Sequence, residues 1–361
     1  MKQFVLSREQ NDSSLTLDLA RAIAAQMVCI GHAANIFLGP GSTYLHHVGV
    51  LIFFVLSGFL IAHTLFTKAD EPRYCFAEFM IERIAGIYSA YFPALFVIAI
   101  VDYLMWRAGL FSVNFSPVIF LKNLLMLQNY PGPFNLGGPT FGSAGQLSSL
   151  AAEFHIYVFV GAIFFTVLGR RRLTMLAIAL LSAAMPLGYF LGISGTDRGL
   201  FVLWLLGFGS YFVARVTKMD RESAIYAGVL FPLLCAYWYL KRDIGNEYDI
   251  QHYPVFLCAF FAMMVASQGS SWLIRSIALK KAITVFADYA FSLFLLHYTM
   301  VKVVNVCFPD SGVSGLVFSV VCANVISYVF AITTENKHRN LSQKLKAWLL
   351  GYHRKPKVLP S

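Results

Sequence analysis

Long apolar runs separated by short polar stretches make up most of the chain. A helix that crosses a bilayer needs about 20 mostly apolar residues. Ten segments approach that length: 17–38, 45–66, 84–106, 147–168, 173–193, 199–214, 224–240, 253–268, 283–301 and 313–334. Because each run is continuous and does not alternate apolar with polar positions, the pattern excludes a transmembrane β-barrel. We therefore predict an all-α fold: a polytopic membrane protein with about ten transmembrane helices.

The composition agrees with this prediction. Hydrophobic residues make up 58% of the 361-residue chain, charged residues make up 13%, and the mean hydropathy is +0.65. Soluble domains carry about 25% charged residues. The composition therefore argues against a soluble enzyme and excludes a disordered chain, a collagen, a coiled coil and a disulfide-stapled mini-protein. The six cysteines show no C-x-x-C spacing, and we interpret them as small core residues.

The basic residues predict the orientation of the chain. With a cytoplasmic N-terminus, the connections on the cytoplasmic side carry 21 of the 28 Lys and Arg residues, those on the other side carry six, and Arg21 lies within a span. Cytoplasmic loops are enriched in Lys and Arg. We therefore predict that both termini are cytoplasmic, with a single ten-span domain over residues 1–334 and a basic cytoplasmic tail over 335–361. The net charge of +10 is attributed to this topology, so no nucleic-acid partner is predicted.

Two segments outside the spans have a predicted role. The connection 107–146 contains a cluster of Gly and Pro from Pro131 to Gly145, which cannot form a regular helix. We interpret it as a lid or re-entrant segment over an outward-facing cavity. The stretch 341–350 is short, basic and amphipathic, which is typical of a helix on the inner leaflet surface.

Ionisable side chains inside the first span are the first functional signal. A charge at the bilayer centre costs at least about 2.5 kcal/mol, so it marks a cavity or a partner. The first span contains Asp18, Arg21 and His32. The spacing of Arg21 and His32 returns to within about 20° of the same helix face and rises about 16 Å. Either a guanidinium that orients an anion lies below a histidine general base, or Asp18 and Arg21 form a local pair and His32 is a buried structural histidine.

Two later spans carry further ionisable residues. In the fourth span, Glu153 either orients His32, binds an acceptor hydroxyl or makes a helix–helix hydrogen bond. His155 points about 200° away from it, so the two cannot face one site. In the ninth span, Asp288 and His297 are expected on opposite faces of one helix, and His297 is the better candidate to line a cavity.

Ser57 in the second span is the remaining candidate. A serine in a membrane span is more often a packing contact than a nucleophile. The sequence also shows no G-x-S-x-G, P-loop, H-E-x-x-H or G-x-G-x-x-G motif.

Taken in order, these residues resemble the motifs of the acyltransferase-3 family of bacterial integral-membrane acyltransferases. Arg21 and His32 match its Arg-x10-His pattern. The other similar segments are Phe53–Ile61 (F-F-x-L-S-G-F), Arg83–Tyr91 (R-x-x-R-I-Y-P-x-Y), Ser148–Tyr157 (W-S-L-x-x-E-x-x-x-Y), Phe291–His297 (S-x-x-L-x-H) and Glu335-Asn336 in place of a Glu-Pro. The chain departs from the family pattern at three positions, where Arg, Pro and Trp are replaced by Gly86, Ser89 and Ser148.

The resemblance implies an O-acyltransferase of the bacterial inner membrane. Such an enzyme moves an acyl group, commonly acetyl from cytoplasmic acetyl-CoA, to a hydroxyl of a cell-envelope or exported carbohydrate. The implied partners are the carbohydrate acceptor and the lipid bilayer. Acyl-CoA is the donor, and no metal is predicted because no ligand cluster is seen. The catalytic residues implied are His32, Arg21 and Glu153, and the substrate- or donor-binding candidates are Arg83, Tyr88, Ser57, His297 and Asp18.

The chemistry and one rival function stay open at this point. His32 either takes the proton of the acceptor hydroxyl as it attacks the thioester, assisted by Glu153, or becomes acylated itself. A transporter or export partner for a polysaccharide or a small acyl anion would use the same intramembrane residues as a binding site or proton relay. Against it, no internal repeat or pair of broken helices is visible.

Overall fold

The structure is a computed structural model that describes residues 12–111, 116–132, 136–191, 199–216, 221–241, 253–270 and 276–351. Within these residues the chain is helical, apart from turns and an isolated bridge between Gln128 and Gly138. The elements are α1 (Asp12–Phe37), α2 (Leu45–Lys68), α3 (Phe76–Arg107), α4 (Pro117–Leu124), α5 (Leu147–Val167), α6 (Arg172–Ser182), α7 (Ala184–Leu191), α8 (Leu200–Val216), α9 (Arg221–Lys241), α10 (Tyr253–Ser270), α12 (Ile277–Asp288), α13 (Ala290–Cys307), α14 (Gly312–Thr333), η2 (Glu335–Lys337) and α15 (His338–Leu350).

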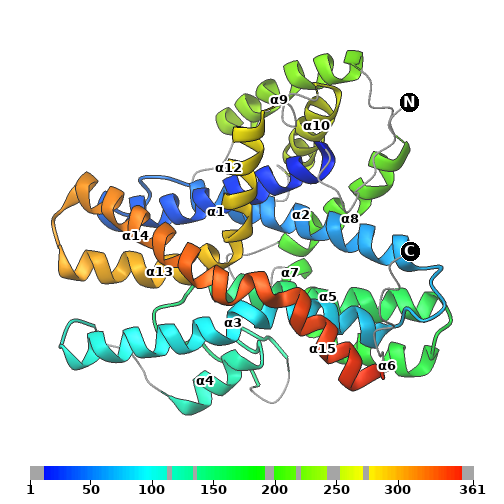
Figure 1. Cartoon of the computed structure of the whole chain (residues 1–361), viewed down its shortest axis with the longest axis horizontal. Helices are drawn as coiled ribbons and strands as arrows, with labels where there is room; N and C mark the ends of the chain where they lie inside the picture. Colours follow the sequence, from blue (N-terminus) through cyan, green and yellow to red (C-terminus); the bar gives the residue numbers. More distant parts are fainter. Residues whose placement is uncertain are drawn as a thin grey trace, which may run out of the picture.

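The helices form a multi-pass membrane bundle. In the described part of the chain, seven helical stretches are long and apolar enough to cross a bilayer: α1, α2, α3, α5, α9, α13 and the stretch that begins with α14. Three shorter apolar helices, α6, α8 and the first part of α10, fall on three further predicted spans. The all-α membrane fold is therefore confirmed, whereas the number ten and the orientation stay predictions. Figure 1 shows α1 beside α2 and α13 beside α14, and these pairs are in contact.

Two predicted spans are interrupted. The run 173–193 divides into α6 and α7 at Ala183. Pro186 has no backbone N–H and its ring crowds the carbonyl four residues earlier, that of Ser182, so a continuous helix is disfavoured there. The hydroxyl of Ser182 instead donates back to the carbonyls of Ile178 and Ala179, at 2.8 and 3.2 Å.

The run 283–301 divides at Tyr289, where α12 ends and α13 begins. Glu335 supports this break, because its Oε2 accepts from both the backbone N–H and the hydroxyl of Ser292, at 2.9 and 2.7 Å. These bonds satisfy a donor in the first turn of α13 that has no partner within the helix. The expectation that Asp288 and His297 occupy opposite faces of one helix is therefore wrong, since Asp288 ends α12 and His297 lies in α13.

Two glycines let α2 and α8 pack backbone to backbone. A methyl group added at Gly58 would overlap the backbone of Trp204, and one added at Gly207 would overlap the backbone of Val55. Small residues at such contacts are typical of membrane helix pairs, which associate by close packing. The close approach brings the indole of Trp204 against the interior side of α2, where Ser57 lies.

The described parts of the connection 107–146, residues 116–132 and 136–146, are folded against the bundle; the predicted lid includes residues 133–135, which lie outside the described residues. The amide of Asn123 donates to the carbonyls of Ile119 and Pro139, both at 2.9 Å, and its Oδ1 accepts from the N–H of Phe141 at 3.0 Å. Further along, the N–H of Ser143 donates to Asp102 of α3 at 2.7 Å. The segment is thus tied to α3 and leads directly into α5.

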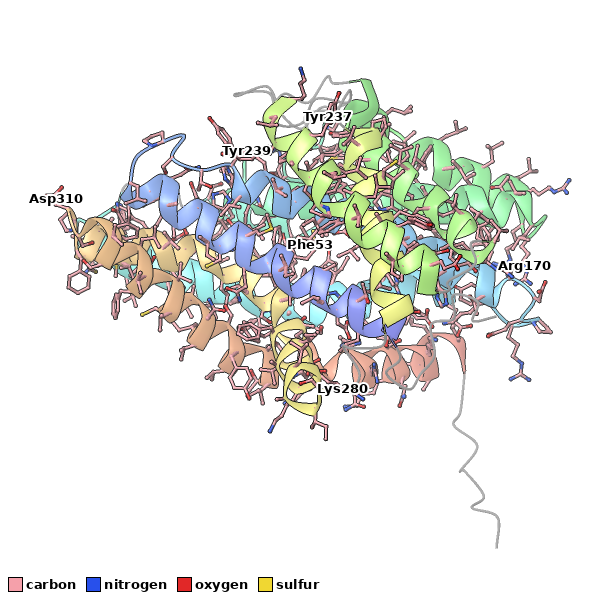
Figure 2. All side chains as sticks on the ribbon, turned by 90° about the horizontal axis from the view of Figure 1, so that it is seen from above. Phe53, Arg170, Tyr237, Tyr239, Lys280 and Asp310 are labelled. Atoms are coloured by element: carbon pink, nitrogen blue, oxygen red, sulfur yellow. The ribbon has the colours of Figure 1, made fainter. Side chains whose placement is uncertain are left out.

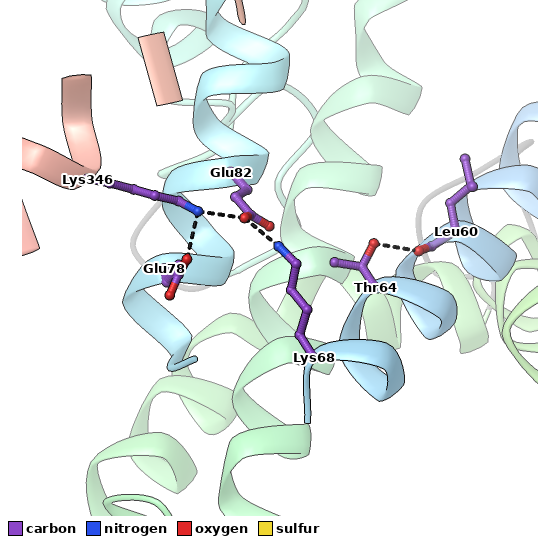
Figure 3. Close-up of polar contacts among 6 residues, drawn as sticks. All are labelled: Leu60, Thr64, Lys68, Glu78, Glu82 and Lys346. Atoms are coloured by element: carbon purple, nitrogen blue, oxygen red, sulfur yellow. Dashed lines mark hydrogen bonds and ion pairs between the residues drawn. The ribbon is translucent and has the colours of Figure 1, made fainter. Parts of the chain in front are cut away.

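The C-terminal helix α15 is clamped to α3. Lys346 reaches Glu78 and Glu82 at 2.7 Å each, and Lys68 at the end of α2 reaches Glu82 at 2.6 Å. Figure 3 shows the two lysines meeting at Glu82. The indole of Trp348 is 79% exposed on the same helix. The position of α15 on the inner leaflet surface stays a prediction.

We expect Gly207→Ala to lower the stability of the bundle. The added methyl group has to displace the α2 backbone, and overpacking of this kind costs about 1–3 kcal/mol. Gly209→Ala is the matched control on the same helix, because nothing lies within 4 Å of a Cβ there. Thermal unfolding in detergent should show a lower midpoint for Gly207→Ala only, and equal midpoints would contradict the backbone contact.

Candidate active site

A polar cavity, here called the inner pocket, lies between the middle of α2 and the first turns of α3. Its volume is about 310 Å³. The name follows the predicted cytoplasmic side. Its lining includes both arginines of the family motifs, three carboxylates and several apolar side chains: Arg21, Phe53, Leu56, Ser57, Leu60, Ile61, Glu82, Arg83, Gly86, Ile87, Leu150, Glu153, Tyr157, Phe291, Glu335 and His338.

Among the residues that the structure describes, Arg83 is a cation of this pocket that forms no direct ion pair, although its charge acts on nearby Glu153. Its Nε is buried without a hydrogen-bond partner, and its guanidinium stacks only loosely on Phe79, 6.0 Å from the ring centroid. Arg21 forms an ion pair with Asp18 at 3.5 Å. A half-buried arginine without a direct ion pair suits an anionic ligand, since charged groups inside a protein need a partner.

The carboxylates of the pocket, in contrast, are all engaged. Glu82 is held by Lys68 and Lys346, and Glu335 by Ser292. Arg83 is therefore the residue of this pocket best placed to contact an anionic ligand.

A chain of hydrogen bonds crosses three helices and ends on Glu153. The indole N–H of Trp204 in α8 donates to the Oγ of Ser57 in α2 at 2.9 Å. Ser57 and Tyr157 of α5 share a bond of 2.8 Å, and the phenol of Tyr157 donates to Glu153. Because carboxylates only accept and indoles only donate, every proton in the chain points toward Glu153.

A second cavity, here called the outer chamber, lies where α1 ends and α2 and α5 begin. Its volume is about 220 Å³. Its lining is rich in imidazoles and hydroxyls: Val28, His32, His46, His47, Val50, Gly145, Gln146, Ser148, Ser149, Phe294 and Tyr298. The ring of His32 lies 4.5 Å from that of His46 and 4.8 Å from that of Tyr298, centroid to centroid.

His297 lies behind His32 and is fully buried. Its ring stacks on His32 with a centroid separation of 5.3 Å. Its Nδ1 faces the carbonyls of Leu293 and Phe294 at 2.9 and 3.0 Å, so Nδ1 carries the proton, because carbonyls only accept. Its Nε2 is buried without a partner. A fixed, neutral imidazole thus supports the ring that faces the chamber.

A small intermediate cavity of about 40 Å³ joins the two larger ones. It shares Phe53, Leu150, Glu153 and Phe291 with the inner pocket, and Val50, Ser149 and Phe294 with the outer chamber. The three cavities therefore follow one another along the bundle axis. Figure 2 shows Phe53 in the interior, between the end that carries Asp310 and the end that carries Arg170.

The structure groups most of the predicted site residues, but in two places. Arg21, Ser57, Arg83 and Glu153 line the inner pocket, whereas His32 lines the outer chamber with His297 behind it. Arg21 and His32 therefore lie on the same face of α1 but line two different cavities.

Three further candidates lie outside both cavity linings. Asp18 contacts Arg21, and the hydroxyl of Tyr88 donates to the carbonyl of Leu124 at 2.9 Å. His155 bonds to the carbonyl of Met126 at 2.9 Å, away from Glu153 as expected. In the part of the chain that the structure describes, no group of three or more His, Cys, Asp or Glu side chains is placed to hold a metal ion.

Several functional side chains were not singled out from the sequence. Tyr157 lies four residues after Glu153, a spacing that brings side chains together on a helix, so it could have been found. His46 carried no comparable signal, because its contact with His32 depends on how α1 and α2 pack. That packing requires Gly31, where a Cβ would overlap the backbone of His46.

Comparison with known proteins identifies the family to which the chain belongs. Searches of curated proteins and of solved structures found no match. A family model described as an acyltransferase domain matches residues 15–334, which include the lining of both cavities apart from Glu335 and His338. This chain therefore belongs to the acyltransferase-3 family and is a membrane acyltransferase.

Proposed function

We propose that the protein transfers an acetyl group from cytoplasmic acetyl-CoA to a hydroxyl of a cell-envelope or exported carbohydrate. One observation carries the proposal: a pocket lined by an arginine without a direct ion pair and a chamber with a cavity-facing histidine meet through a narrow cavity. Acyl transfer from CoA needs such a division, because the anionic end of the donor and its thioester lie far apart on one slender molecule.

The inner pocket holds the CoA end in this proposal. Arg83, with Arg21 beside it, binds phosphate oxygens through charge-assisted hydrogen bonds. Gly86 leaves open space in the wall, since nothing lies within 4 Å of a Cβ there. Glu153 lines both the inner pocket and the intermediate cavity, where its carboxylate can accept from an amide N–H of the pantetheine arm.

The chemical step takes place in the outer chamber. The acceptor hydroxyl attacks the thioester carbonyl carbon, and its proton passes to the free ring nitrogen of His32. The tetrahedral intermediate then breaks its carbon–sulfur bond. The CoA thiolate leaves and takes that proton from His32, so the products are the ester and CoA thiol. His297, with its tautomer fixed, holds the imidazole of His32 in place.

The outer chamber suits a carbohydrate. Its polar groups are hydroxyls, an amide and imidazoles, which bind sugar hydroxyls as both donors and acceptors. Tyr298 adds an aromatic ring to the wall. We further propose that this chamber opens away from the cytoplasm, as the distribution of Lys and Arg predicts, and that the protein resides in the bacterial inner membrane.

The topology has a direct test. A reporter fused after Thr334 should read cytoplasmic, and one inserted within 136–142 should read external. Alkaline phosphatase and fluorescent protein fusions would measure this. An inverted result at either position rejects the proposed orientation.

His32→Ala should abolish transfer. A positioned general base contributes about 10²–10⁴-fold in rate, so activity should fall at least about 100-fold. His32→Gln keeps a hydrogen-bonding tip but cannot take the proton, and it should be nearly as inactive. The measurement is transfer of isotope from labelled acetyl-CoA to surface glycan, at matched protein levels in the membrane.

The control for this prediction is His155→Gln, which changes a histidine outside both cavities. It should retain activity. If His32→Gln kept most of its activity, His32 would be a structural hydrogen-bond partner. If the wild-type protein moved labelled substrate across the membrane without forming an ester, the transporter would be favoured.

Arg83→Ala should raise the KM for acetyl-CoA more than it lowers kcat. A phosphate contact remote from the reacting carbon binds the ground state and the transition state alike. Arg83→Lys keeps the charge and should lie between the wild type and Arg83→Ala. Steady-state kinetics in proteoliposomes would separate the two parameters, and a loss confined to kcat would assign Arg83 to the chemistry or the fold.

A further inference from the structure

Two aromatic rings narrow the passage between the two polar cavities. Phe53 of α2 and Phe294 of α13 pack edge to face, with ring centroids 5.8 Å apart. Phe53 lines the inner pocket and the intermediate cavity, and Phe294 lines the intermediate cavity and the outer chamber. The ring pair therefore stands between the two larger cavities.

The intermediate cavity is narrow and mostly apolar, which disfavours a continuous column of water. Its volume of about 40 Å³ is close to the ~30 Å³ that one water molecule occupies in the liquid. Six of its lining residues are apolar: Val50, Phe53, Phe54, Leu150, Phe291 and Phe294. Apolar cavities of this size stay dry, and apolar constrictions stop permeation by dewetting.

The two polar residues of this cavity already have partners. The hydroxyl of Ser149 donates to the carbonyl of Gln146 at 3.1 Å, one turn back on α5. Glu153 accepts from Tyr157. In the described part of the chain, no hydrogen bond joins these two side chains to each other across the cavity.

We propose that Phe53 and Phe294 form a gate that separates the two cavities when no donor is bound, and that its width selects the acyl group that can pass. The second part rests on the proposed function. An acyl group has to pass the gate to reach His32, because the thioester is the leading end of the donor. An unbranched acyl group is as slender as the arm that follows it, whereas a branched one is wider. The gate therefore admits acetyl-CoA and excludes branched acyl-CoA donors.

The gate is tested by proton permeability, which needs no substrate. The full chain is reconstituted into liposomes that contain a pH-sensitive dye, and proton influx is driven by a potassium gradient with valinomycin. Phe53→Ala and Phe294→Ala should each raise influx severalfold above the wild type, because loss of a ring joins two water-filled cavities. Phe53→Leu and Phe294→Leu keep apolar bulk in the gate and should leak less than the alanine variants.

The matched control is Phe92→Ala. Phe92 lies on α3, is 45% exposed and packs on Phe96, with ring centroids 4.9 Å apart. Its loss should leave influx at the wild-type level. Influx that stays at the wild-type level in both gate variants, with monodisperse protein, overturns the gate.

Donor width is tested with acetyl-CoA and isobutyryl-CoA on the same proteins. The ratio of kcat/KM for isobutyryl-CoA to that for acetyl-CoA should rise about tenfold or more in the two alanine variants, the scale of a methylene-sized change in an apolar site. An unchanged ratio with raised influx overturns the selection of donors. Raised influx with no acetyl transfer by the wild type keeps the gate and rejects the proposed function.

Discussion

A carboxylate buried inside a membrane bundle has to be surrounded by donors, and in this protein Glu153 imposes that requirement on three helices. Tyr157 of its own helix donates to it, Ser57 of α2 contacts Tyr157, and Trp204 of α8 donates to Ser57. Leaving one buried member of such a chain unpaired costs about 1–3 kcal/mol. The relative positions of α2, α5 and α8 are thereby specified by a polar contact.

The close packing of α2 and α8 follows from the same requirement. Trp204 can reach Ser57 only because Gly58 and Gly207 let the two backbones touch. The glycines and the hydrogen-bond chain act together: the first permits the approach, and the second gives it a defined register. The wall of the inner pocket formed by α2 and α5 is consequently rigid next to Glu153.

The sequence predicted the parts of this structure that depend on one helix at a time. Continuous apolar runs located the membrane helices, and helical spacing placed Arg21 and His32 on one face and turned His155 away from Glu153. Hydropathy averages over a window, so it missed the break that Pro186 causes and the one that Glu335 supports at Tyr289.

The division of the site into two cavities also could not be predicted from the sequence. Whether Arg21 and His32 act in one cavity or two depends on which side chains of other helices lie between them. Those side chains, Phe53 and Phe294, are ordinary apolar residues in the pattern. The polar residues could therefore be found by type and spacing, but their separation required the packing of α2 against α13.

The carboxylate of Glu335 joins two parts of the molecule that are remote in sequence. It lies just after α14 and caps the first turn of α13, which carries His297 and Tyr298 toward the outer chamber. Since α15 follows directly and is clamped to α3 by Lys346, the ends of three helices are mechanically linked beside the inner pocket. A helix is stiff along its axis. If ligand binding in the inner pocket shifted this linked unit, α13 would therefore move as a rigid body. His297 of α13, which stacks on His32, would then respond to the occupied state of a pocket that neither ring lines.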